Sequence, residues 1–196
     1  IRDILKKMLT RFYDTFFNQF FFYIIAFIPL KRKREWGKFF IFSQGRTGSK
    51  LLTDLLNSHD EIYCDKELFN HSFYLGSGEI LAPDKLIDGK AKWHKNKAYG
   101  FKDKIYQIDK QKNISSPEDF VHYLYRNNWK IIYLERKNTL KHVLSGMIAK
   151  KRKQYHAYKN KEEKDFGKVY INPEELISKI EKRRRFKKRE KEILND

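Results

Sequence analysis

The sequence predicts an α/β fold in which helices cover both faces of a central, mainly parallel sheet. Two short apolar runs, 39–42 and 129–134, have the length and the aromatic and β-branched content of buried strands. A glycine-rich turn and a leucine-rich helical pattern follow the first run. Strands that alternate with helices in this way are typical of a three-layer α/β/α domain.

The composition indicates a folded domain with polyanionic partners. Hydrophobic residues make up 40% of the 196 residues and charged residues 35%, which is ordinary for a globular protein. The formal net charge of +18 favours a nucleotide, an acidic glycan, an anionic membrane surface or nucleic acid, without choosing among them. Because Cys64 is the single cysteine of the sequence, no internal disulfide and no cysteine-rich metal site are expected.

Residues 1–35 form an apolar and basic segment that precedes the domain at 36–196. The uninterrupted apolar run, 20–30, is too short for a bilayer, which needs about 20 residues. The basic cluster 31–34 follows at once and suits an anionic lipid surface. A membrane-interface helix, a poor spanning helix and a helix packed on the domain all remain open. Because no small-residue cleavage site follows the run, we expect a cytoplasmic protein, membrane-associated if this segment contacts lipid.

The stretch after the first predicted strand is the strongest candidate for a binding site. Glycines let the backbone approach an anion, and the N–H groups at the start of a helix favour negative charge. We therefore predict a phosphate cradle that consists of Ser43, Gly45, Arg46, Thr47, Gly48, Ser49 and Lys50.

The helix after this loop should bury one apolar face, formed by Leu51, Leu52, Leu55 and Leu56. The nucleoside-triphosphate loop Gly-x-x-x-x-Gly-Lys-Ser/Thr is not present, because only Arg46 and Thr47 separate the glycines. This difference weakens a kinase or ATPase interpretation. Another P-loop nucleotide enzyme remains an alternative.

The rest of the chain is interpreted in the same way. Residues 72–97 are predicted to be a loop, and the alternation over 99–106 predicts a strand. Ser116 and Pro117 predict a helix that runs to about residue 127, and the sequence around Asn172 predicts the start of a long basic helix.

A second candidate for anion binding begins where the run 129–134 ends. Arg136 follows that strand, and parallel-sheet proteins place ligand groups at the carboxyl ends of their strands. A guanidinium offers a fixed fork of donors that suits a phosphate. Ser145, on the helix that follows, can add a hydroxyl to the same anion.

Both candidate stretches resemble motifs of the sulfotransferases that use 3′-phosphoadenosine 5′-phosphosulfate (PAPS), especially the bacterial and carbohydrate sulfotransferases. SQGRTGSKLLTDLLNSHDEIYCDKELF is similar to the first motif of that family, GFKDKIYQ to a following segment, and RKNTLKHVLS to the 3′-phosphate site. Lys50 stands where the family usually has threonine, and Lys104 where it tends to be apolar. Because the family domain continues past such a long helix, we expect its C-terminal end to be missing.

The resemblance implies a sulfotransferase with a P-loop-like nucleotide-binding fold. It would transfer a sulfuryl group from PAPS, without a metal, to a hydroxyl of a carbohydrate or glycolipid. Arg46 would neutralise charge that develops on the bridging oxygen. Arg136 and Ser145 would hold the 3′-phosphate.

Glu67 falls where the resemblance implies the catalytic base, which accepts the proton of the acceptor hydroxyl. His59 and His71 are weaker candidates for this role. The remaining interpretation is a non-catalytic basic protein that binds a membrane or nucleic acid, and nucleic acid is the less expected of these partners.

Overall fold

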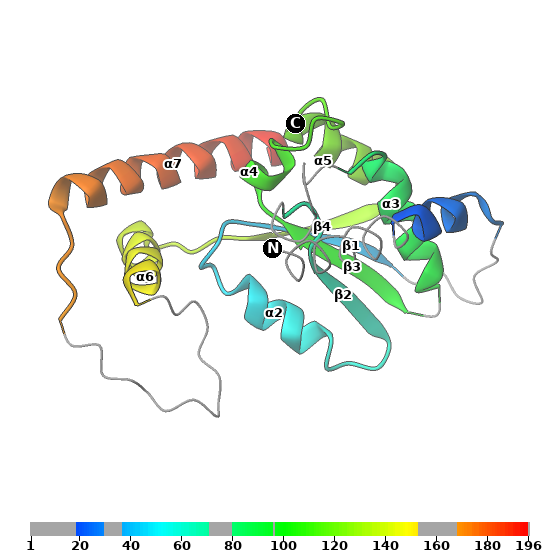
Figure 1. The fold of residues 1–196 in the computed structure, drawn as a ribbon, viewed down its shortest axis with the longest axis horizontal. Helices are drawn as coiled ribbons and strands as arrows, with labels where there is room; N and C mark the ends of the chain where they lie inside the picture. Colours follow the sequence, from blue (N-terminus) through cyan, green and yellow to red (C-terminus); the bar gives the residue numbers. More distant parts are fainter. Residues whose placement is uncertain (1–18, 30–36, 71–79, 96, 153–167, 196) are drawn as a thin grey trace, which may run out of the picture. The chain divides into compact units, whose positions relative to one another are not determined.

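The structure is a computed structural model that describes residues 19–29, 37–70, 80–95, 97–152 and 168–195. It is an α/β protein whose strands form one all-parallel sheet flanked by helices (Figure 1). The chain divides into two compact units. Unit 1 comprises Ile1–Ser43 and Ser49–Leu134, and unit 2 comprises Gln44–Gly48 and Glu135–Asp196.

The sheet of unit 1 is arranged around β1 (Lys38–Ser43). This strand pairs with β3 (Ala98–Asp103) on one side and with β4 (Trp129–Leu134) on the other. β2 (Ile62–Glu67) pairs with β3, and the strand order is β2-β3-β1-β4. Because every pair is parallel, the carboxyl ends of the strands lie along one edge of the sheet. The strands predicted over 39–42 and 129–134 are confirmed, as is the parallel sheet.

Aromatic rings fill the core of unit 1. Phe40 and Phe101 are paired across β1 and β3, with ring centroids 4.9 Å apart, and Phe101 meets Trp129 at 5.3 Å. Phe120 lies edge-on against Phe69 at 5.2 Å. All five side chains are buried. Edge-to-face packing adds to the free energy that burial of these rings provides, so the predicted strands are held together by a continuous aromatic core.

Helix starts are predicted correctly where a capping residue and a proline mark them. α5 (Pro117–Arg126) begins after Ser116, whose Oγ accepts a hydrogen bond from the N–H of Asp119. α7 (Pro173–Asn195), in unit 2, begins after Asn172, whose Oδ1 accepts hydrogen bonds from two backbone N–H groups of the first turn. Both starts confirm the sequence prediction.

One further prediction is wrong, and another is confirmed only in part. The segment 72–97, predicted as a loop, contains α3 (Pro83–Trp93), although its first part lies outside the described residues. The strand predicted over 99–106 ends at Asp103, and the short helix α4 (Ile105–Ile108) follows. Because a glycine and several lysines interrupt the apolar pattern of α3, the sequence did not predict this helix.

α2 (Ser49–Leu56) forms as predicted but buries its leucine face only in part, because Leu52 and Leu56 are half-buried. Leu51 and Leu55 are exposed, whereas Thr53 is buried and donates a hydrogen bond from Oγ1 to the carbonyl oxygen of Ser49, at 2.8 Å. The buried side of α2 therefore carries the hydroxyl residues Ser49 and Thr53, and the Thr53 hydroxyl is satisfied by the backbone of its own helix.

Residues 19–27 form a helix that packs against α3 within unit 1. The Oη of Tyr23 accepts a hydrogen bond from the N–H of Ala82 at 3.3 Å, and Lys92 Nζ donates to the carbonyl oxygen of Ala26. The rings of Phe21 and Trp93 meet edge to face at 5.1 Å. One face of this helix therefore packs on the domain, as one of the three alternatives for this segment predicted. In the described part of the chain, no helix is long and apolar enough to cross a membrane.

We expect Gly89→Ala to destabilise unit 1, although alanine favours a helix. An ideal Cβ at Gly89 would lie 1.8 Å from the carbonyl oxygen of Phe22, a backbone atom that can move only if the helix over 19–27 moves. Overpacking costs about 1–3 kcal/mol and alanine gains about 0.5–1 kcal/mol, so the loss should dominate. Urea unfolding measures the difference.

Gly37→Ala is the matched control, because nothing lies within 4 Å of a Cβ at Gly37. It should leave the unfolding midpoint almost unchanged. Equal midpoints for the two variants would contradict the close approach of the helix to α3.

Candidate functional site

The loop Gln44–Gly48 of unit 2 has an unusual backbone. Arg46 has a φ of 73° and Gly48 a φ of 93°, both in the left-handed region. Glycine adopts this region freely, but at Arg46 it costs about 1–2 kcal/mol. Thr47 supports the turn, because its Oγ1 donates a hydrogen bond to the carbonyl oxygen of Gln44 at 2.8 Å. Such strain often occurs at functional sites, which makes Arg46 a candidate for a functional role.

Arg46 connects the first predicted motif with the second. Its Nε and Nη2 both donate to the Oγ of Ser145 on α6 (Thr139–Lys151), at 3.2 and 3.1 Å. The Ser145 hydroxyl accepts these two bonds and keeps its own hydrogen to donate. Nη1 of Arg136 makes a long contact of 3.4 Å to the carbonyl oxygen of Arg46. Unit 2 therefore brings together three residues that the sequence analysis assigned to anion binding.

His142, buried in α6, supports the same loop. Its Nε2 lies 2.6 Å from the carbonyl oxygen of Gly45, which can only accept, so Nε2 carries the proton. Nδ1 has no hydrogen-bond partner among the described residues. Burial lowers the pKa of His142, the Gly45 carbonyl partly opposes this, and the charges of Arg183, Lys187 and Arg136 lower it further. The neutral imidazole is therefore the form that fits.

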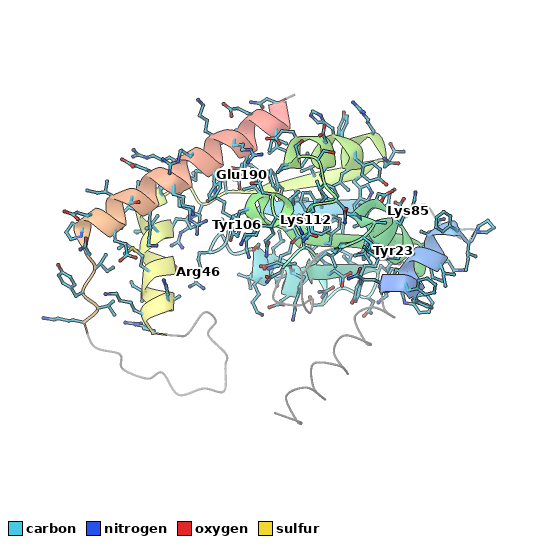
Figure 2. The ribbon with its side chains drawn as sticks, turned by 45° about the horizontal axis from the view of Figure 1, so that its top comes forward. Tyr23, Arg46, Lys85, Tyr106, Lys112 and Glu190 are labelled. Atoms are coloured by element: carbon cyan, nitrogen blue, oxygen red, sulfur yellow. The ribbon has the colours of Figure 1, made fainter. Side chains whose placement is uncertain are left out.

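α7 reaches the loop through a buried amide. Gln44 donates from Nε2 to Glu190 at 2.9 Å and accepts at Oε1 from Arg183 Nη1 at 3.0 Å (Figure 2 labels Arg46 and Glu190). Gln44 and Glu190 are buried, so these bonds form away from competing water. Each end of the amide therefore has a partner that fits its donor or acceptor character.

Lys187 of α7 ties down the second predicted motif. Its Nζ donates to the carbonyl oxygen of Arg136 at 2.7 Å and to Glu135 at 3.0 Å. Asn138 caps α6, because its Oδ1 accepts from the N–H of Lys141 at 2.8 Å. The asparagine of the second motif therefore has a structural role here, whereas the guanidinium of Arg136 has one long contact among the described residues.

The remaining cradle residues belong to unit 1. Ser43 is the buried last residue of β1, and Ser49 begins α2. Lys50 forms an ion pair with Asp54 on the exposed side of α2. Ser43, Ser49 and Lys50 therefore lie on β1 and α2, and only Gln44–Gly48 form the irregular loop.

Glu67 ends β2 at the carboxyl edge of the sheet. A register irregularity between Asp65 and Glu67, of the kind that re-aims side chains near functional sites, precedes it. Its Oε1 accepts from Lys104 Nζ at 2.7 Å, with Lys102 Nζ at 3.6 Å, and its Oε2 accepts from Gln107 at 2.8 Å. A further amide, Asn70 Nδ2, lies 3.1 Å from Oε2.

These partners decide the charge of Glu67. Burial raises its pKa, but the hydrogen bonds from Lys104 and Gln107 and the charge of Lys102 outweigh burial and lower the pKa below its ordinary value. The carboxylate is therefore ionised at neutral pH, as a proton acceptor must be, although a lowered pKa makes it a weaker base.

The neighbouring Asp103 has a structural role. It is fully buried and accepts hydrogen bonds from the N–H groups of Leu68 at 3.0 Å and Phe69 at 3.1 Å. It thereby holds the chain directly after Glu67. His59 is exposed and accepts a turn hydrogen bond from the N–H of Glu61, and His71 lies outside the described residues.

Sequence reasoning missed Gln44, His142, Arg183, Lys187 and Glu190. Nothing in the local sequence distinguishes these five residues, because Glu190 is one of several acids in the basic stretch and the others lie in ordinary polar runs. Within the described residues, no three His, Cys, Asp or Glu side chains form a group that could hold a metal ion.

Comparisons with family models, curated proteins and solved structures find no match to this chain. Its function is therefore inferred from its own residues.

We expect the imidazole of His142 to titrate below about 6.5, the ordinary histidine pKa, with the neutral ring protonated at Nε2. Because the unfolded chain takes up this proton first, the folded protein should lose stability as the pH falls from 6.5 toward the folded pKa. Two-dimensional NMR of the ring nitrogens reports both the tautomer and the pKa. An Nδ1–H tautomer, or a pKa above 6.5, would contradict the bond to Gly45.

Proposed function

We propose that this chain is a PAPS-dependent sulfotransferase that acts on a hydroxyl of a carbohydrate or glycolipid. The observation that carries the proposal is the double hydrogen bond from the Arg46 guanidinium to Ser145 Oγ. The family resemblance assigns these two residues, far apart in sequence, to the same cofactor. Their contact within unit 2 brings these two positions together and so supports the proposal.

The charge around this contact suits a nucleotide with several phosphate groups. Arg46, Arg136, Arg183 and Lys187 all contribute to the same network of unit 2. Glu190 and Glu135 offset part of that charge, at Gln44 and at Lys187. Guanidinium groups bind phosphate in a fork geometry, and a partly desolvated setting strengthens each charge-assisted bond.

The proposal includes a finer fold assignment, a three-layer P-loop-like sulfotransferase domain. The all-parallel sheet with the order β2-β3-β1-β4 and the glycine-containing turn between β1 and α2 support it. In α/β sheets, ligands bind beyond the carboxyl ends of the strands, and both predicted anion-binding stretches directly follow strands.

The reaction would be an in-line displacement at sulfur. The acceptor oxygen forms a bond to sulfur while the bond from sulfur to the bridging phosphate oxygen breaks, and the proton of the acceptor goes to Glu67. Arg46 would stabilise the negative charge that develops on the bridging oxygen. Lys102 and Lys104 keep Glu67 ionised until the proton arrives.

We expect 3′-phosphoadenosine 5′-phosphate, the spent cofactor, to bind more tightly than ATP in isothermal titration. Arg136→Ala should weaken binding about 10- to 100-fold, because a hydrogen bond to a charged group contributes about 1.5–3 kcal/mol. Lys137→Ala removes the same charge from an exposed neighbouring position and should have little effect. Equal binding of ATP would favour another P-loop nucleotide enzyme, and no binding of either nucleotide would overturn the proposal.

Glu67→Gln should lower kcat for sulfation of the acceptor about 10²- to 10⁴-fold, the usual contribution of a general base, and leave binding of the spent cofactor unchanged. Asp60→Asn, at an exposed acid, is the control. Because the pKa of Glu67 is lowered, kcat/KM of the wild type should decline only at a pH below about 4.3, which is the ordinary glutamate pKa. Unchanged turnover in Glu67→Gln would remove this residue from the mechanism.

A further inference from the structure

The helix over 19–27 has two unlike faces. Ile25 is buried, and Phe22 and Tyr23 are half-buried on the side of α3. Ile24 and Phe27, one helical turn apart, are exposed. This helix therefore satisfies its contacts with unit 1 and still presents an apolar stripe to the outside.

The inner face packs closely on α3, so the stripe faces away from it. Gly89 lets the backbone of Phe22 approach α3, and Lys92 donates to the carbonyl oxygen of Ala26 at the end of the helix. Tyr23 fixes the helix to Ala82. Figure 2 shows Tyr23 and Lys85 on these two neighbouring helices.

The stripe continues onto α3. Trp93 is exposed and packs edge to face on the exposed ring of Phe21. Phe20, one turn before Ile24, is exposed as well, and we call these exposed side chains together the aromatic face, which consists of Phe20, Phe21, Ile24, Phe27, Ile28 and Trp93.

The charges beside the aromatic face are mainly lysines. Lys85 Nζ lies 5.8 Å from the centroid of the Phe27 ring, and Lys92 of α3 contacts the C-terminal end of the helix over 19–27. Asp84, paired with Lys85 at 3.3 Å, is the acid nearest to this lysine on α3. Residues 19–29 contain no charged side chain, and the basic cluster 31–34 follows in sequence.

We propose that the aromatic face docks on the interfacial region of an anionic lipid bilayer, with the helix over 19–27 lying in the membrane plane. Exposed Phe and Ile would enter the acyl boundary, a Trp suits the headgroup level, and flanking lysines suit anionic headgroups. We favour lipid over a protein partner because an anionic bilayer offers both an apolar interior for the exposed side chains and negative headgroups for the flanking lysines. The proposal does not depend on the sulfotransferase assignment.

The test is co-sedimentation of the full chain with phosphatidylcholine vesicles, with and without phosphatidylglycerol. Phe27→Glu changes a side chain that is 74% exposed, and Tyr125→Glu is the matched control, because Tyr125 on α5 is 75% exposed and the change in charge is the same. Wild type and Tyr125→Glu should bind anionic vesicles, with higher salt weakening the binding. Phe27→Glu should bind about tenfold more weakly.

Equal loss in both Glu variants would show that net charge alone drives binding, and would overturn the proposal. If both Glu variants bind anionic vesicles as well as wild type, the binding comes from basic stretches elsewhere in the chain, and the proposal is overturned as well. If wild type does not bind vesicles, the proposal is overturned. If wild type is then a dimer by light scattering and Phe27→Glu is a monomer, a second copy of the chain covers the aromatic face instead. Circular dichroism checks that each variant is folded.

Discussion

The parallel pairing of β1 with both β3 and β4 is the constraint on which the rest of the structure depends. The central position of β1 buries Phe40, Ile41 and Phe42 completely. It also places Ser43 beside Leu134 in the register, so the chain leaves unit 1 for unit 2 at the ends of two neighbouring strands. A one-residue slip would move the aromatic core to the wrong face of the sheet.

Charge is managed differently in the two units. In unit 1, the Glu67 carboxylate is surrounded by two lysines and two amides, which leaves a stable, ionised acid. In unit 2, arginines and a lysine outnumber the acids around Gln44–Gly48, and the neutral His142 supports the loop without adding charge. This excess of half-buried positive charge would suit an anionic ligand.

Close backbone packing gives the N-terminal segment its two faces. Gly89 admits Phe22 at a distance that no side chain at position 89 would allow, so one face of the helix is committed to α3. The same contact leaves Ile24 and Phe27 outside. Membrane contact and packing on the domain, which the sequence presents as alternatives, are therefore compatible, because they use opposite faces of one helix.

The sequence by itself determined the elements whose signals are local: the apolar strands β1 and β4, and the capped starts of α5 and α7. It also indicated Arg46, Arg136 and Ser145 as candidates for anion binding, in two separate motifs. Only the tertiary structure decided that α3 is a helix, that Thr53 rather than Leu51 is buried, and that Gln44 and His142 support the loop Gln44–Gly48. Caps, prolines and apolar runs act within a few residues. Burial and hydrogen bonding across the fold depend on partners that lie far away in the chain.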